Sequence, residues 1–329
     1  MMSTAALQPA VVRIKGKNTS VPSATISDRQ VVVTGSMLKV AQVFDEELVE
    51  GEAVPDPAAF IRHLKGSSLR ADIFTFAQRP PEITPKFNEH FEWDNWAVAP
   101  TADPAAWWES LPQEARKNVR RSAKRGVQVR TVQFDDVLVE GIRGIYNETP
   151  VRQGKKFWHY GKDFETVKDE SGTYPDRSEF VGAFLGEELI GFLKMIYVNR
   201  AAMLIHILAK NAHHDKRPMN AILAHAVEVC ARKNMSMLVY GAYIYGKKND
   251  SSLTEFKRRN GFEQVNFPRY YVALSAKGRA ALACGMHLGA ANLIPKTVTD
   301  LLLQCRSRVL QTWRGRAASR SVAVEESRG

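Results

Sequence analysis

The stretch EFVGAFLGEELIGFLKMIYVNRAAMLIHILAK, residues 179–210, decides the fold class. It contains three runs rich in aromatic and β-branched residues, separated at Leu-Gly-Glu-Glu (185–188) and at Asn199-Arg200. Glycine and asparagine between such runs are typical of hairpin turns. The stretch therefore predicts three consecutive strands of one sheet.

Strand and helix patterns alternate on both sides of this meander. Downstream, a helix entered through Pro218 is followed by a short strand, a second helix at 251–261 and a last strand at 262–274. Upstream, strand patterns at 29–35, 71–79, 91–100 and 127–134 alternate with helical patterns at 55–64, 103–126 and 134–154. This order predicts an α/β (α+β) protein with a mixed, twisted sheet and helices on both faces.

The composition is that of an ordinary globular protein with a basic surplus. Of the 329 residues, 44% are hydrophobic and 25% charged, and the formal net charge is +11. The surplus favours an anionic partner. The chain has no apolar run of about 18 residues for a membrane span and no pattern of a signal peptide. Three widely spaced cysteines build no disulfide framework, so we expect a cytoplasmic location.

Motifs for metal, nucleotide and hydrolase sites are missing from the sequence. It contains no HExxH, paired CxxC, Walker A, GxGxxG or GxSxG pattern. The adjacent His213 and His214 point in different directions and are a poor ligand pair. We therefore expect no metal.

Four segments in this order resemble the GNAT acyltransferase superfamily, and within it the Fem-type (FemAB-like) branch of bacterial peptidyl and aminoacyl transferases. They are ARKNVRRSAKRGVQVR (115–130), VGAFLGEELIGFLKMIYV (181–198), KRPMNAILAHAVEVCARKNMSMLVYG (216–241) and LTEFKRRNGFE (253–263). The resemblance covers roughly residues 115–275 and implies two tandem GNAT-like halves.

The domain organisation follows from the resemblance and from local composition. We expect a disordered N-terminus at 1–28, a degenerate N-terminal GNAT-like half at 29–114, and a C-terminal GNAT-like acyltransferase domain at 115–275. Residues 276–329, with nine Lys/Arg against three Asp/Glu, are expected to be a basic helical appendage and tail. The alternative for this tail is an amphipathic helix on an anionic membrane surface.

The resemblance places the donor site at the start of the helix that contains Pro218. Exposed amides at a helix N-terminus attract phosphates, and Lys216 and Arg217 add positive charge. Pro218, Met219 and Asn220 stand where many GNAT proteins have glycines, so the site departs from the usual coenzyme A loop. Tyr245 and Lys247 are expected to line the same cleft. The structural alternative is a plain capped helix with two surface cations.

Lys257 is the principal catalytic candidate. It lies four residues before Gly261-Phe262, where many GNAT enzymes have a tyrosine that protonates the leaving group. A lysine there can protonate a leaving group or stabilise its negative charge. We expect the Lys257 ammonium to face a gap between two diverging strands. The alternative is a solvated helix face made of Lys257, Arg258 and Arg259.

The polar and aromatic segment NETPVRQGKKFWHYGKDF (147–164) is the expected acceptor loop. Arg152, Gln153, Trp158 and Tyr160 are its candidate contacts with a small-molecule amine or peptide acceptor. His159, Glu148 and, as an alternative, Glu179 are candidate acceptors of the amine proton.

A basic ridge occupies the helix near residues 113–125. Lys117, Arg120, Arg121 and Lys124 fall on neighbouring positions of one helical face, which suits contact with phosphates or tRNA. Such ridges are more often solvated surfaces.

These features together predict an N-acyltransferase that uses an acyl-CoA, for example acetyl-CoA, or an aminoacyl-tRNA as donor. The alternative is a non-catalytic, degenerate GNAT scaffold that binds RNA or an anionic membrane surface. The sequence contains no signal for an oligomeric state.

Overall fold

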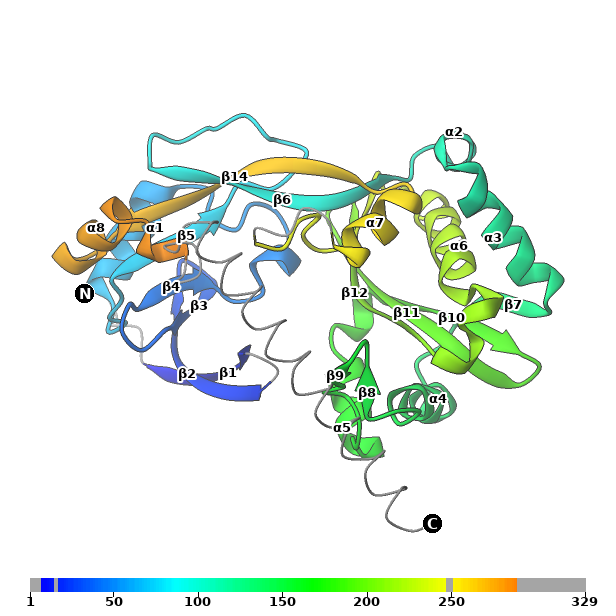
Figure 1. Ribbon diagram of the computed structural model, residues 1–329. Helices are drawn as coiled ribbons and strands as arrows, with labels where there is room; N and C mark the ends of the chain where they lie inside the picture. Colours follow the sequence, from blue (N-terminus) through cyan, green and yellow to red (C-terminus); the bar gives the residue numbers. More distant parts are fainter. Residues whose placement is uncertain (1–6, 15–16, 247–250, 289–329) are drawn as a thin grey trace, which may run out of the picture.

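One continuous sheet extends through both halves of the protein (Figure 1). The computed structural model describes residues 7–14, 17–246 and 251–288. Within them, twelve strands form one mixed sheet, in the order β1-β2-β3-β4-β5-β14-β6-β13-β12-β11-β10-β7. The first five are β1 (Gln8–Ile14), β2 (Lys17–Ile26), β3 (Arg29–Thr34), β4 (Val40–Val43) and β5 (Ile73–Ala77). The others are β6 (Phe91–Pro100), β7 (Val127–Val132), β10 (Ser178–Leu185), β11 (Glu188–Val198), β12 (Ala201–Ala209), β13 (Met237–Val239) and β14 (Glu263–Ala273).

The three predicted meander strands are β10, β11 and β12. They pair antiparallel, from Leu185↔Glu188 at the first turn and Val198↔Ala201 at the second. Almost every residue of β11 is buried because both faces of the sheet are covered. A continuous apolar strand is therefore stable here, where alternating polarity would leave charges in the core.

Helices cover both faces of the C-terminal half, as the sequence predicts (Figure 1). On one face lie α2 (Pro104–Ser110), α3 (Gln113–Lys124), α6 (Pro218–Arg232) and α7 (Ser252–Arg259). On the other lie α4 (Asp136–Tyr146) and α5 (Phe164–Ser171). The N-terminal half contains α1 (Pro57–Gly66), and α8 (Ala276–Ala283) follows β14. Shorter elements are the 3-10 helices η1 (Glu46–Leu48), η2 (Pro175–Arg177), η3 (Asn211–Lys216) and η4 (Met286–Leu288), and a small hairpin of β8 (Val151–Arg152) and β9 (Lys155–Lys156).

Local sequence explains the main helix boundaries. Asp56 and Asp103 each precede a proline and accept a hydrogen bond from the backbone amide three residues further on, so α1 and α2 begin there. Ser251 caps α7 in the same way through the Thr254 amide. The capping residues therefore fix the start of the helix that contains Lys257.

The sheet continues without a break across the predicted boundary at residue 114. β14, late in the sequence, pairs with β6 from Glu263↔Val98 to Tyr270↔Phe91 and with β5 from Arg269↔Ala77 to Ala273↔Ile73. β6 pairs in turn with β13. The two halves therefore share a central ribbon of β6 and β14, and neither half has a sheet of its own.

The predicted disorder of residues 1–28 is wrong for residues 8–14 and 17–26, which form β1 and β2. These strands pair with each other from Gln8↔Ser23 to Ile14↔Lys17, and β2 continues onto β3. Val21, Ala24 and Ile26 are buried in this sheet. The signal was hidden because Ser and Thr residues stand between these few apolar positions, so strict alternation is lost.

The predicted basic tail falls mostly outside the described residues, which include only α8 and η4 of the 276–329 segment. Among the described helices, none has the length and apolar character required to cross a membrane.

Two helix-ending glycines provide a matched test of this packing. Gly126 after α3 and Gly261 after α7 both have positive φ, +79° and +74°. A Cβ on Gly261 would meet Trp107 Nε1 at 2.5 Å, whereas on Gly126 the nearest atom is at 3.6 Å. We expect Gly126→Ala to cost about 1 kcal/mol from backbone strain alone. We expect Gly261→Ala to cost about 3 kcal/mol, because overpacking is added.

Urea unfolding of the two variants measures both costs. Equal costs for the two substitutions would contradict the close packing of Gly261 on α2.

Candidate functional site

Two strands of the sheet diverge next to α7. β12 and β13 are parallel neighbours only from Ala201↔Met237 to Met203↔Val239. Beyond this point β12 continues to Ala209, while the chain leaving β13 follows β6 instead. The Tyr240 amide donates to the Ala97 carbonyl, and the Ala97 amide donates to the Gly241 carbonyl. Among the described residues, the edge of β12 from 204 to 209 therefore has no strand paired with it on the β13 side.

Lys257 lies at this divergence and is fully buried. Its Nζ donates a hydrogen bond of 2.6 Å to the Ala242 carbonyl, in the chain that leaves β13. The same ammonium lies 4.4 Å from the centroid of the Tyr240 ring and 4.8 Å from that of Tyr245. The solvated-face alternative therefore holds for Arg258 and Arg259, which pair with Glu255 on the surface, and is wrong for Lys257.

Burial changes the acidity of Lys257. Burial removes water from the ammonium and lowers its pKa from 10.5 to about 8. An ammonium with a pKa near neutrality can both stabilise negative charge and give up a proton. The aromatic rings on either side stabilise the charged form partly, through cation–π attraction.

At the start of α6, Pro218 occupies the first helical turn, and Asn220 bonds another helix. Arg217 adopts a left-handed conformation (φ 56°) directly before the buried Pro218, and no side chain caps the helix. Lys216 lies beside Asp215, 3.4 Å from its carboxylate. Asn220 donates to Asn260 at the end of α7, which links the two helices. Phosphate binding at this end of α6 stays a prediction.

Tyr245 lies at the divergence and is half exposed, at 51%. Lys247, the other residue predicted to line the donor cleft, lies outside the described residues.

Glu148 and Arg152 form a structural clamp. Both oxygens of Glu148 accept backbone hydrogen bonds, from Asn211 at 2.7 Å and Ala212 at 2.8 Å, and Arg152 is 3.0 Å away. Arg152 also donates to the Ala209 and Ile145 carbonyls. These contacts hold the end of β12 against α4, and they occupy the groups that the sequence analysis assigned to proton transfer and acceptor binding.

His159 is buried in an aromatic cluster. Its ring lies 3.3 Å from that of Trp158 and 4.0 Å from that of Tyr146, measured between centroids. Burial, with help from Lys162, lowers the pKa of His159 to about 2, so the ring stays neutral. Its Nδ1 lies 3.3 Å from the Lys162 ammonium. This arrangement favours a packing function for His159 over proton transfer.

The remaining acceptor candidates lie at the surface of the same loop. Gln153 occupies the turn between β8 and β9 with φ 51°. Trp158 carries the Arg13 guanidinium 3.9 Å above its ring, so the loop contacts β1 of the other half. Tyr160 is 46% exposed. Glu179, the alternative base, lies 3.1 Å from Lys233 and accepts a hydrogen bond from Tyr197.

The basic ridge lies on the outer face of α3. Lys117, Arg120 and Lys124 are exposed, and Arg120 lies over the Trp108 ring. Arg121 bonds Asn118. The neighbouring Arg125 is tied to the Asp215 carbonyl and carboxylate, which fixes α3 against the loop before α6. Contact with nucleic acid through the ridge stays a prediction.

A cavity between the halves contains a carboxylate that the sequence analysis did not single out. This cavity, about 530 Å³, is lined by residues of the N-terminal half, including Glu47 and Trp96, and by residues of the C-terminal half, including Met203 and Met237. Glu47 also lines a second cavity of about 520 Å³ on the adjoining surface of β4, β5 and β14. Burial raises the pKa of Glu47, and the Asp45 carboxylate adds to the effect. Burial raises the pKa of the Tyr245 hydroxyl, and the negative charge of Glu47 adds to the effect.

Arg79 fixes the loop that presents Glu47. Its guanidinium donates to the carbonyls of Glu46, Glu47 and Val49 and also to that of Gly51. The far side of the loop is bound to the C-terminal half, through Tyr174 to Asp45 and Arg177 to Glu50. No short motif could have revealed Glu47, because the arginine, tyrosine and cavity around it come from distant parts of the chain.

Structural comparison finds the same fold in solved structures that include FemX and L-PGS. A crystal structure of FemX matches with a TM-score of 0.50 and 10% identity, over 85% of this chain and 90% of that chain. The structure of L-PGS from Bacillus licheniformis matches with a TM-score of 0.50 and 12% identity, over 82% and 87%. The mixed α/β fold predicted from the sequence is thereby confirmed, and it is the fold of FemX and L-PGS. No protein-family model and no curated protein matches the sequence.

Lys257→Met tests the burial of the charge without an assay of function. Methionine fills a similar volume and removes the cost of desolvating an ammonium. Because the pKa of Lys257 is lower in the folded than in the unfolded state, the unfolded wild type binds more protons between about pH 8 and 10.5. We therefore expect wild-type stability, relative to Lys257→Met, to rise across this range and to be lowest below pH 8.

Urea unfolding at pH 7 to 10.5 measures the difference. A constant difference would show that Lys257 titrates normally.

Proposed function

We propose that the protein is an N-acyltransferase that moves an acyl or aminoacyl group from a thioester or ester donor to an amine. The observation that carries the proposal is the buried Lys257 ammonium at the point where β12 and β13 diverge. A buried cation has little competition from water, so it stabilises developing negative charge strongly. The fold shared with FemX and L-PGS supports this assignment.

The donor is held in the gap between the diverging strands. The free edge of β12 offers backbone hydrogen bonds to an extended chain, and the uncapped N-terminus of α6 offers amides to a phosphate. A coenzyme A thioester and a tRNA ester share an acyl carbonyl, an anionic leaving group and nearby phosphates. Lys216 and Arg217 suit either donor, and we propose acyl-CoA as the first to test.

The acceptor amine enters from the cavity between the halves. Its nitrogen attacks the acyl carbonyl, and the carbon–sulfur or carbon–oxygen bond to the leaving group breaks. The proton of the attacking amine passes to the Glu47 carboxylate, whose raised pKa makes it a better base. Lys257 stabilises the negative charge of the leaving thiolate or ribose oxygen, or protonates that atom. Holding both substrates in place supplies much of the remaining acceleration.

The rival is a scaffold that binds RNA or an anionic surface without catalysis. Its support is the set of exposed cations on α3, Lys117, Arg120 and Lys124. Such binding weakens steeply with salt and does not depend on Lys257.

A donor screen distinguishes the two functions. We expect one class, acyl-CoA or aminoacyl-tRNA, to raise the melting temperature and to support acylation of an amine. Lys257→Met should lower kcat by about 100-fold with the fold intact. Arg258→Met, an exposed cation one residue away, is the matched control and should retain activity. Salt-sensitive RNA binding with no donor effect would support the scaffold instead.

The pH profile of the same reaction tests both assigned groups. We expect the rate to fall above about pH 8, as Lys257 loses its proton, and to fall in acid, as Glu47 gains one. Lys257→Arg should move the alkaline fall to higher pH, and Glu47→Gln should remove the acid fall and slow the reaction. Glu52→Gln, in the same cavity, should do neither. An acid fall that survives Glu47→Gln would contradict the base assignment.

A further inference from the structure

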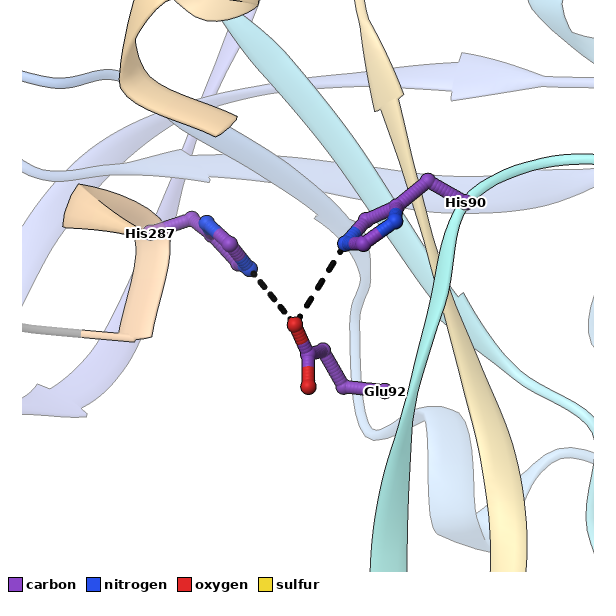
Figure 2. Close-up of side chains that lie close together, drawn as sticks. All are labelled: His90, Glu92 and His287. Atoms are coloured by element: carbon purple, nitrogen blue, oxygen red, sulfur yellow. Dashed lines mark ion pairs between the residues drawn. The ribbon is translucent and has the colours of Figure 1, made fainter. Parts of the chain in front are cut away.

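Three side chains with metal-ligand chemistry meet beside the second cavity (Figure 2). His90 directly precedes β6, Glu92 lies on β6, and His287 lies in η4 after β14. His90 Nε2 lies 3.4 Å from Glu92 Oε1, and His287 Nε2 lies 3.6 Å from the same oxygen. All three ligand atoms are within 4.8 Å of one another. The two imidazoles thus converge on one carboxylate oxygen.

These separations fit shared coordination better than hydrogen bonding. A hydrogen bond from an imidazole to a carboxylate is typically about 2.7–3.0 Å long. Zinc bonds of about 2.0–2.1 Å to nitrogen and oxygen, at tetrahedral angles, separate neighbouring ligand atoms by about 3.3 Å. The observed 3.4 and 3.6 Å lie close to that edge length.

His287 supplies an independent observation. Its side chain is only 2% exposed, and both ring nitrogens are buried without a hydrogen-bond partner among the described residues. A buried, unsatisfied polar group costs about 1–3 kcal/mol, so such groups usually have a reason. A metal ion bound at Nε2 would satisfy the nitrogen that faces Glu92.

Tyr271 restricts the two imidazoles, and the nearby Arg269 pairs with carboxylates other than Glu92. The Tyr271 ring lies 4.6 Å from the His287 ring and 6.4 Å from that of His90, measured between centroids, which restricts both imidazoles. The nearby Arg269 forms ion pairs with Asp94 at 2.8 Å and with Glu46 at 3.0 Å. Its positive charge is therefore matched by two other carboxylates.

We propose that His90, Glu92 and His287 form a binding site for a divalent transition-metal ion of the zinc type. Two imidazoles and one carboxylate are a donor set for zinc, cobalt or nickel rather than magnesium or calcium. His90 is half exposed, so the fourth position is open to water. The ion would join η4 to β6 at the rim of the cavity that His287 and Tyr271 line.

The expectation of no metal rested on the absence of compact ligand motifs, and this cluster is not a compact motif. His90 and Glu92 are close in sequence, but the third ligand follows only after β14 has returned alongside β6. The pairing of these strands, with the Tyr271 amide donating to the His90 carbonyl, brings the distant histidine to the site.

Metal titration of tag-free protein, first dialysed against a chelator, tests the site directly. We expect one equivalent of Zn²⁺ by calorimetry, a higher melting temperature with zinc, and visible absorption of four-coordinate character with Co²⁺. His90→Asn, Glu92→Gln and His287→Asn should each weaken zinc binding by at least about 100-fold. His214→Asn, an exposed histidine of η3 outside the cluster, is the matched control.

The outcomes separate the site from folding and from the transferase proposal. His90→Asn removes a half-exposed ligand, so its metal-free melting temperature should match the wild type. Loss of the single zinc site in the three cluster variants, with binding kept in His214→Asn, supports the proposal. No zinc binding, or binding that the cluster variants leave unchanged, overturns it. Neither result depends on an acylation assay.

Discussion

The pairing of β14 with β6 and β5 is the constraint on which the rest of the structure depends. It places the last strand of the C-terminal half in the middle of the sheet, so the two halves cannot separate without breaking two ladders. α7 directly precedes β14, with only Asn260, Gly261 and Phe262 between helix and strand. The position of Lys257 is therefore set by the ribbon that joins the halves. Arg269, in the same strand, adds ion pairs to β6 and to the loop of Glu47.

Burial shifts the pKa values of two ionisable groups toward each other. The pKa of Lys257 falls because its ammonium is desolvated, and the pKa of Glu47 rises for the same reason. Each charge comes from a different half, and the Tyr245 ring lies 4.8 Å from the Lys257 ammonium. Such opposed shifts are typical of functional sites, because a base and an acid are most useful with pKa values near the working pH.

Local patterns predicted the parts of the fold that are set by neighbouring residues. The meander at 179–210, the helix entered through Pro218 and the helix–strand step at Gly261 follow from turn residues, capping and periodicity. Lys257 was singled out because the resemblance to GNAT enzymes places it where many of them have a tyrosine. The contacts of Glu148 and Arg152 with Asn211, Ala212 and the end of β12 could not be predicted, because these partners are distant in sequence.

The remaining features need the assembled sheet. β2 has few apolar residues, and it is held in the sheet by its pairing with β1 on one side and β3 on the other. Glu47 gains its environment from Arg79 and the facing half, and the His90–Glu92–His287 cluster needs β14 to return along β6. Single-sequence patterns contain no information on such long-range neighbours.

The most direct test of the central claim is a crystal structure with a non-reactive donor analogue, either a ketone analogue of an acyl-CoA or an amide-linked aminoacyl-tRNA fragment. The account predicts that the analogue lies between β12 and the chain leaving β13, with its carbonyl or leaving-group atom about 3 Å from Lys257 Nζ. A donor bound elsewhere, with Lys257 still bonded only to the Ala242 carbonyl, would contradict it.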